Sequence, residues 1–304
     1  MKRRTFLHST GALALASGLA PNFCPTKALA ESTSVKPRFE FGIQQYTFRR
    51  PIKSGKLDVL DYPMHCKTEL GISNIEYWSG GLKKHKEAGY LAELKKRSVG
   101  EGLKNILILV DGIPQIDSPN AKVRAASTEG HKPWVDIAAG LECESIRINV
   151  NAGGDEAENL KHAIAGLPPL LDYAQKAGVR ILLENHGGNS SKGDWVAKLM
   201  TAVKHPAFGT LPDFGNFKSY DRYKGIEEMM PWAGTVCAKS HAFDDKGDEV
   251  KIDYFKMMKI VCASEYKGVI SIEYEGGDQT PEAGSIATRE LLKRAAAAAG
   301  ESFA

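Results

Sequence analysis

The segment Val179–His186, which reads Val-Arg-Ile-Leu-Leu-Glu-Asn-His, decides the fold of this chain. Its apolar run has the length of a strand and stops at an acid, an amide and an imidazole. Such a run of branched apolar residues is typical of a strand buried in a parallel sheet. Polar side chains just beyond the carboxyl end of such a strand lie where α/β sheets and barrels hold ligands. The segment therefore predicts a parallel α/β architecture with a candidate site that begins at Glu184.

Outward from this segment, strand-like apolar runs alternate with stretches of helical spacing along the chain. The expected strands cover residues 39–46, 72–77, 105–110, 145–150, 179–184, 208–213, 235–240 and 269–274. The expected helices cover residues 57–70, 91–99, 121–141, 156–177 with a break or kink at Pro168-Pro169, a segment from 195, then 226–230, 252–263 and 281–299. Eight units of about 31 residues fit a (β/α)8 TIM barrel. A doubly wound open sheet is the alternative, but no G-x-G-x-x-G motif follows an early strand. We therefore expect one TIM-barrel domain over residues 39–304.

The first thirty residues have the features of an export signal. Arg3 and Arg4 precede a short apolar segment, and Ala28-Leu29-Ala30 forms a small-residue cleavage signature. The apolar segment is shorter than the roughly 20 residues that span a bilayer. We expect residues 1–30 to be a twin-arginine signal peptide and residues 31–38 a linker. The mature protein is then periplasmic, with no stable membrane anchor after cleavage.

Removal of this signal also changes the charge of the protein. The whole chain carries a formal charge of +3, and cleavage after Ala30 removes four basic residues and no acids, which leaves −1. A near-neutral mature chain has no general attraction to nucleic acids, so none is expected as a partner. Nothing in the sequence indicates an oligomeric state.

Four polar residues end four consecutive expected strands. These are Glu184, Asp213, His241 and Glu273, each separated from the next by about one barrel unit. Taken singly, an acid at a strand end is usually a surface ion pair or a helix cap, and a single histidine is usually structural. Three close carboxylates would repel one another and raise their pKa values, and a cation removes that conflict. Carboxylates with one imidazole favour Mn²⁺ or Mg²⁺, with Zn²⁺ or Co²⁺ as further options.

A second group of residues has weaker claims, as contacts to a substrate. His186 follows Glu184 by two residues, and Lys239 precedes His241 by two. Glu76 ends the second expected strand, and Arg147 lies on the fourth. For each of Glu76 and Arg147, an ion pair inside the barrel is as well supported as a contact to the substrate. His186 has the alternative role of a hydrogen-bond partner to a metal ligand.

These motifs resemble the sugar phosphate isomerase/epimerase family, the xylose-isomerase-like TIM barrels. The resemblance extends from about Phe39 to Ala299. Its most specific motifs are Leu183-Glu184-Asn185-His186-Gly187-Gly188, Asp213-Phe214-Gly215-Asn216 and Ile272-Glu273-Tyr274-Glu275-Gly276. The segment from Lys239 to Asp244 is similar to the family's His-x-Lys-Asp strand end, but it has Phe243 where lysine is common.

The resemblance implies a divalent-metal-dependent isomerase or epimerase that acts on a sugar or keto-sugar. The metal polarises a carbonyl, one glutamate removes the neighbouring proton to give a cis-enediolate, and the other glutamate returns it. By resemblance, Glu184 and Glu273 are both ligands and proton carriers, whereas Asp213 and His241 are ligands only. Glu275 is the alternative to Glu273. The expected partner is a small-molecule carbohydrate.

Three other functions compete with this hypothesis. The same metal site could serve a lyase or dehydratase that acts on a keto-glycoside or a polyol. The barrel could also be a non-catalytic, secreted sugar-binding protein. The related endonucleases for abasic DNA need phosphate contacts and a histidine-rich site, which the near-neutral mature chain and its one strand-end histidine argue against.

Overall fold

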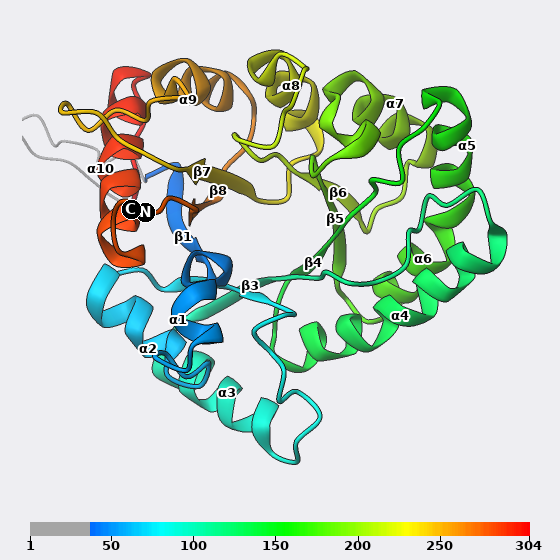
Figure 1. Cartoon of the computed structure of the whole chain (residues 1–304), viewed down its shortest axis with the longest axis horizontal. Coiled ribbons are helices and arrows are strands. Elements are labelled where there is room, and N and C mark those ends of the chain that lie inside the picture. The colour runs from blue at the N-terminus through cyan, green and yellow to red at the C-terminus, as the bar shows by residue number, and fades with distance from the viewer. Residues whose placement is uncertain (1–36) are drawn as a thin grey trace, which may run out of the picture. The chain divides into compact units, whose positions relative to one another are not determined.

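Eight parallel strands alternate with helices, as the sequence predicts (Figure 1). The strands are β1 (Phe39–Gln44), β2 (Asn74–Trp78), β3 (Lys104–Leu109), β4 (Ser145–Ile148), β5 (Arg180–Glu184), β6 (Phe208–Leu211), β7 (Val236–Ser240) and β8 (Gly268–Tyr274). Their order is β6-β5-β4-β3-β2-β1-β8-β7. This computed structural model describes residues 37–304. The expected signal peptide, and the linker up to residue 36, lie outside the described residues.

The two ends of this sheet meet at a short seam between β6 and β7. Thr210 bridges Ala233 and Asp213 bridges Cys237, both in the parallel sense. The Cys237 N–H donates to the Pro212 carbonyl at 2.9 Å, and the Phe214 N–H donates to the Cys237 carbonyl at 3.1 Å. Pro212 has no N–H to continue the ladder, so β6 ends one residue before it. The seam closes the sheet, and the (β/α)8 TIM barrel is confirmed.

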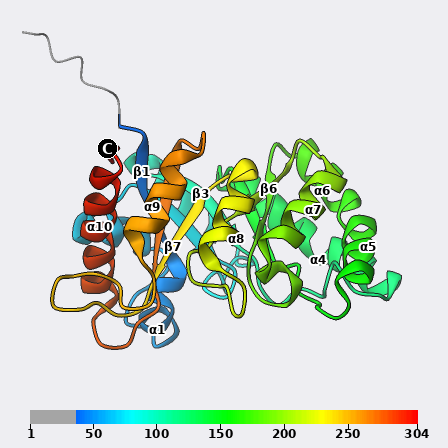
Figure 2. The same ribbon diagram turned by 90° about the horizontal axis from the view of Figure 1, so that it is seen from above.

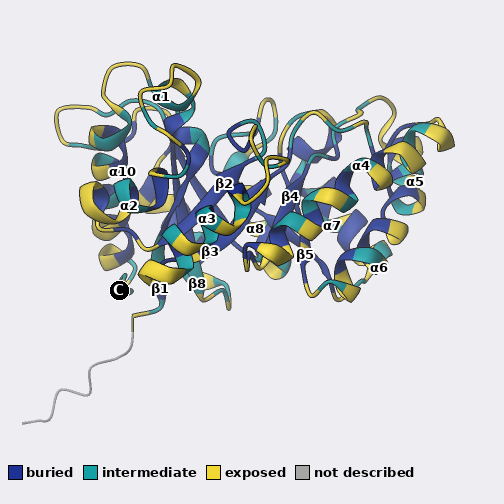
Figure 3. Ribbon diagram, turned by 90° about the horizontal axis from the view of Figure 1, so that it is seen from below, coloured by how far each residue is buried: buried dark blue, intermediate teal, exposed yellow. Residues whose placement is uncertain are grey.

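Helices surround the barrel and turn their exposed faces outward (Figure 3). They are α1 (Arg49–Lys53), α2 (Tyr62–His65), α3 (Tyr90–Ser98), α4 (Ala121–Gly140), α5 (Glu156–Gly166), α6 (Pro168–Lys176), α7 (Gly193–Val203), α8 (Arg222–Met229), α9 (Tyr254–Ala263) and α10 (Pro281–Ala298). None of these helices of the described chain combines the length and apolar character needed to cross a membrane.

The helices differ from the sequence-based prediction mainly in their bounds. The segment 156–177 breaks where its two prolines predict, into helices that meet at Leu167, because Pro168 and Pro169 supply no N–H to continue the first helix. The segment 57–70 is helical only from Tyr62, and its last five residues form a π-turn. Gly71 ends that turn in the left-handed conformation, with φ of 66°, which a glycine adopts at no steric cost. The strands therefore agree with the prediction more closely than the helices do.

The barrel interior holds both apolar and buried polar side chains. A small apolar cluster from the strands lies beside the buried polar groups: Trp78, Ile106, Leu107, Leu109, Leu182, Leu211 and Cys237. The loops after β7 and β8, together with α1, lie at the carboxyl ends of the strands, away from the C-terminus of the chain (Figure 2). That end of a TIM barrel is where ligands bind.

Candidate active site

Glu184 is the last residue of β5 and is almost fully buried, with 2% of its surface exposed. Arg147 Nε lies 2.9 Å from Glu184 Oε2, and the Asn216 amide donates to Oε1 at 3.1 Å. Burial raises the pKa of Glu184, although the charges of Arg147 and Lys239 act against the rise. Arg147 and Glu184 are thus an interior ion pair, which is one of the two roles that the sequence allows for Arg147.

Asp213 follows Pro212 and is held by the backbone around it. Its Oδ1 accepts hydrogen bonds from the backbone of Gly215 at 2.6 Å and of Asn216 at 3.0 Å. Asn185 accepts from the Asp213 N–H at 2.8 Å and donates to the Asp213 carbonyl at 2.9 Å. Among the described residues, Asp213 Oδ2 accepts no hydrogen bond. One carboxylate oxygen is therefore fixed, and the other faces the centre of the site.

Lys239 lies at that centre and is 4% exposed. Its Nζ lies 2.7 Å from Glu275, 3.1 Å from Glu273 and 3.3 Å from Asp213. Burial alone would lower the pKa of Lys239, but Asp213 and Glu273 raise it well above its ordinary value. Sequence reasoning assigned Lys239 to substrate binding, and the structure gives it a central ionic role among the carboxylates.

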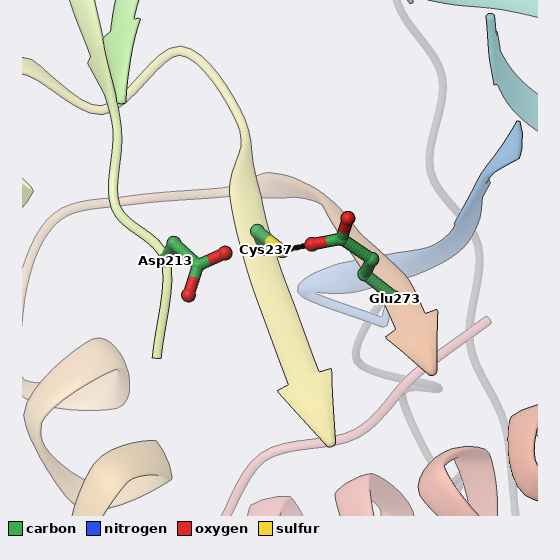
Figure 4. Close-up of side chains that lie close together, drawn as sticks. All are labelled: Asp213, Cys237 and Glu273. Atoms are coloured by element: carbon green, nitrogen blue, oxygen red, sulfur yellow. Dashed lines mark hydrogen bonds between the residues drawn. The ribbon is translucent and has the colours of Figure 1, made fainter. Parts of the chain in front are cut away.

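Cys237 is a further residue of this cluster, and sequence reasoning missed it. Its thiol donates to Glu273 Oε2 at 3.2 Å, and the side chains of Asp213, Cys237 and Glu273 converge from neighbouring elements (Figure 4). One possible ligand atom from each of these three residues lies within 4.8 Å of the other two. Burial raises the pKa of the Cys237 thiol well above its ordinary value, so the protein holds a thiol there rather than a thiolate. The period-two alternation of a strand, which places Cys237 on the face of Lys239, was the available signal.

The two candidate histidines form none of the hydrogen bonds and ion pairs described above, but the charge of Glu275 acts on His241. His241 comes directly after β7 and is half-buried, and its backbone N–H donates to Glu249 Oε1 at 3.3 Å. His186 is exposed, and its backbone N–H donates to Ser190 Oγ at 3.1 Å. Neither imidazole belongs to the Asp213–Cys237–Glu273 group. Their roles as ligand and as substrate contact stay predictions.

The barrel fold agrees with the comparison to known families. Residues 68–295 match the family described as the xylose isomerase-like TIM barrel. The chain belongs to this family. A comparison with curated protein sequences gives no match.

Solved structures share the fold of this family member at low sequence identity. A D-tagatose 3-epimerase-like protein is 16% identical, with a TM-score of 0.69, over 86% of this chain and 98% of its own. The IOLI protein with a binding zinc atom is 14% identical, with a TM-score of 0.68, over 84% and 97%. The probable 3-DHS dehydratase AsbF from Bacillus anthracis is 15% identical, with a TM-score of 0.62, over 83% and 97%. At such identities the likeness shows a shared fold.

The charged groups of the site carry a net negative charge that a divalent cation would balance. Ion pairs connect five acids and three bases in this site: Asp111, Glu184, Asp213, Glu273 and Glu275 with Arg49, Arg147 and Lys239. When all are ionised, the acids exceed the bases by two charges. Asp213 Oδ2 and Glu184 Oε2 are buried oxygens that accept no hydrogen bond from the described residues. Hard carboxylate oxygens of this kind suit a divalent cation, so the donor set fits the metal.

Glu76 lies deeper in the same barrel and is fully buried. The Ser271 hydroxyl donates to its Oε1, and its Oε2 accepts no hydrogen bond from the described residues. Burial raises the pKa of Glu76 to about 8, and the charges of Glu273 and Glu184 add to the rise. The carboxyl group of Glu76 is therefore protonated in the neutral range, next to the negative charges of Glu184 and Glu273.

This protonated carboxyl group predicts a pH-dependent difference in stability between the wild type and Glu76→Gln. The folded pKa lies above the unfolded value of about 4.3, so between pH 5 and 8 the folded protein holds a proton that the unfolded chain has lost. The stability that Glu76 contributes is therefore present at low pH and lost as the pH rises toward 8. Both proteins are compared without metal. We expect the free energy of unfolding of Glu76→Gln, relative to that of the wild type, to rise by about 1.4 kcal/mol for each pH unit in this window. Urea unfolding from pH 5 to 8 measures the gain, and a constant difference between the two proteins would contradict it.

Proposed function

We propose that the protein is a divalent-metal-dependent isomerase or epimerase of a sugar or keto-sugar. The observation that carries this proposal is the position of two buried glutamates, Glu184 at the end of β5 and Glu273 near the end of β8. These strands flank the segment and the strand that carry Asp213 and Lys239. The structural neighbours include sugar epimerases, and one neighbour binds zinc, which supports the same proposal.

The two glutamates are suited to carry a proton in opposite directions. Burial raises the pKa of both, which brings each carboxylate closer to the neutral range where a base exchanges protons readily. A divalent cation held by Glu184, Asp213, His241 and Glu273 would supply Lewis-acid polarisation of a substrate carbonyl. One glutamate removes the proton from the carbon beside that carbonyl, and the other glutamate returns a proton. Return to the opposite face of the same carbon gives an epimer, and return to the neighbouring carbon gives an isomer.

The two buried cations of the site stabilise the negative charge that develops on the substrate oxygens. Arg147 and Lys239 are 5% and 4% exposed, so water screens their charges little. Such pre-positioned positive charge stabilises an oxyanion without reorganisation during the reaction. Because we also propose that the protein is exported after cleavage at Ala30, the substrate would be an unphosphorylated sugar.

Solvent-hydrogen exchange tests this proposal. The purified protein is stripped with a chelator, reloaded with Mn²⁺ and incubated with a panel of keto-sugars in D₂O. We expect one deuterium at the carbon beside the carbonyl, in a product with the composition of the substrate. Absence of exchange with every sugar, and with each of Mn²⁺, Mg²⁺, Zn²⁺ and Co²⁺, would contradict the proposal.

Elimination is the second candidate function. The same proton removal can expel a leaving group from the neighbouring carbon, and the dehydratase of the same fold favours considering it. Mass spectrometry of the product separates the two outcomes. Loss of water or of an attached sugar would assign the protein as a lyase, whereas an unchanged composition assigns it as an isomerase or epimerase.

A further inference from the structure

The ammonium group of Lys239 lies where a cation shared by Asp213 and Glu273 would have to bind. Its Nζ is 3.3 Å from Asp213 Oδ2 and 3.1 Å from Glu273 Oε2. A divalent metal binds carboxylate oxygens at roughly 2.0 to 2.6 Å, so a metal on these two oxygens would lie beside the ammonium group. Both side chains of the acids are almost completely buried, and like charges at such a distance repel strongly where water is excluded. The metal and the ammonium group therefore compete for the same two oxygens.

Glu275 is a second ion-pair partner for the Lys239 ammonium group, on the solvent side of the site. Its Oε1 is already 2.7 Å from Lys239 Nζ, and its side chain is 22% exposed, compared with 6% for Glu273. The stem of Lys239 cannot move far, because it packs on Gly215. A Cβ added at Gly215 would lie 2.7 Å from Lys239 Cδ and 3.0 Å from Cγ. Only the end of the side chain is free to change partner.

We propose that Lys239 is a tethered counter-cation of the metal site, which holds Asp213 and Glu273 together in the metal-free protein and passes to Glu275 when a divalent cation binds. This inference rests on the metal of the proposed function and gives Lys239 a second role in the metal-free protein. In the metal-free protein, Lys239 offsets the repulsion between two buried acids. In the loaded protein, the same ammonium group pairs with Glu275 at the outer edge of the site, where a substrate oxygen can reach it.

The full-length protein is freed of metal with a chelator and titrated with Mn²⁺ in a calorimeter. This titration tests the competition between Mn²⁺ and the ammonium group of Lys239. We expect Lys239→Met, which keeps an unbranched apolar stem without the charge, to bind Mn²⁺ at least tenfold more tightly than the wild type. Lys239→Gln should show the same direction. Lys198→Met is the matched control, because Lys198 is exposed on α7 and pairs with Asp194 at 2.8 Å. Its affinity for Mn²⁺ should equal that of the wild type.

A double-mutant cycle tests the transfer to Glu275. Glu275→Gln removes the second partner of Lys239, so it should weaken Mn²⁺ binding more in the wild type than in Lys239→Met. The melting temperature gives a second readout for variants that are unstable without metal, because a ligand that binds only the folded state stabilises it. Mn²⁺ should raise the melting temperature of Lys239→Met more than that of the wild type.

The outcomes separate this inference from the proposed function. Equal or weaker Mn²⁺ binding by both Lys239 variants, with clear binding by the wild type, would overturn the inference and leave the proposed function standing. Equal effects of Glu275→Gln in both backgrounds would overturn the transfer to Glu275. Failure of the wild type and both variants to bind Mn²⁺ or Zn²⁺ would overturn the inference together with the metal dependence of the proposed function.

Discussion

Glu273→Gln is expected to lower solvent-deuterium exchange into the sugar roughly 10³-fold while the fold is retained. Glutamine has the shape of glutamate but cannot take up a proton at neutral pH, so the proton transfer is lost. The Cys237 thiol, which donates to Glu273 at 3.2 Å, still finds an acceptor in the amide oxygen. The variant is assayed at saturating Mn²⁺, so that a weaker metal site does not account for the loss.

The matched control for this prediction is Glu290→Gln. Glu290 is exposed on α10 and pairs with Lys293 at 3.0 Å. This variant should exchange deuterium at the rate of the wild type. If Glu273→Gln keeps its rate within tenfold and Glu275→Gln loses it, the second proton carrier is Glu275, just after β8.

Arg147→Met is expected to destabilise the protein by about 3 to 5 kcal/mol. Arg147 and Glu184 are both almost completely buried, and Arg147 Nε lies 2.9 Å from Glu184 Oε2. Removal of the guanidinium leaves a buried carboxylate that has lost this partner. Urea unfolding of the chelated protein at pH 7 measures the loss.

Two further variants show whether burial causes this large effect. Glu184→Gln in the Arg147→Met background removes the uncompensated charge, so the double variant should regain part of the stability. Arg97→Met breaks pairs with Asp61 and Glu93 whose side chains are at least 38% exposed, and it should cost less than about 1 kcal/mol. A loss in Arg147→Met no larger than in Arg97→Met would contradict the prediction.

The strands could be predicted from the sequence because each is a short apolar run that ends at a polar residue or a turn. The expected strand 179–184 differs from the structure only at its first residue. The helices were less exact because capping and proline decide their ends. Asp221 caps α8 by accepting from Tyr223 N at 2.9 Å, and the helix begins four residues before the predicted start.

The candidate site was predicted in part, since strand ends reveal which elements contribute but not which side chains meet. The strand ends predict a metal among Glu184, Asp213 and Glu273, and in the structure the charges of these three acids act on Lys239. The central place of Lys239 depends on side-chain direction, which spacing along the chain does not give. The ligand role of His241, which directly follows the last residue of β7, stays a prediction.

The seam between β6 and β7 makes the site part of the closure of the barrel. Few backbone hydrogen bonds join these strands, so local opening costs less free energy there than along the regular ladders. Asp213 lies on one side of the seam and Lys239 on the other, and the ion pair between them connects the two edges of the sheet. Replacement of Lys239 by a divalent cation at Asp213, as we propose, would break this contact across the seam. The backbone amides of Phe214 and Cys237 donate the hydrogen bonds of the seam. Their hydrogen-exchange rates should therefore differ between the metal-free and the metal-bound protein, so that barrel closure and metal binding are measured together.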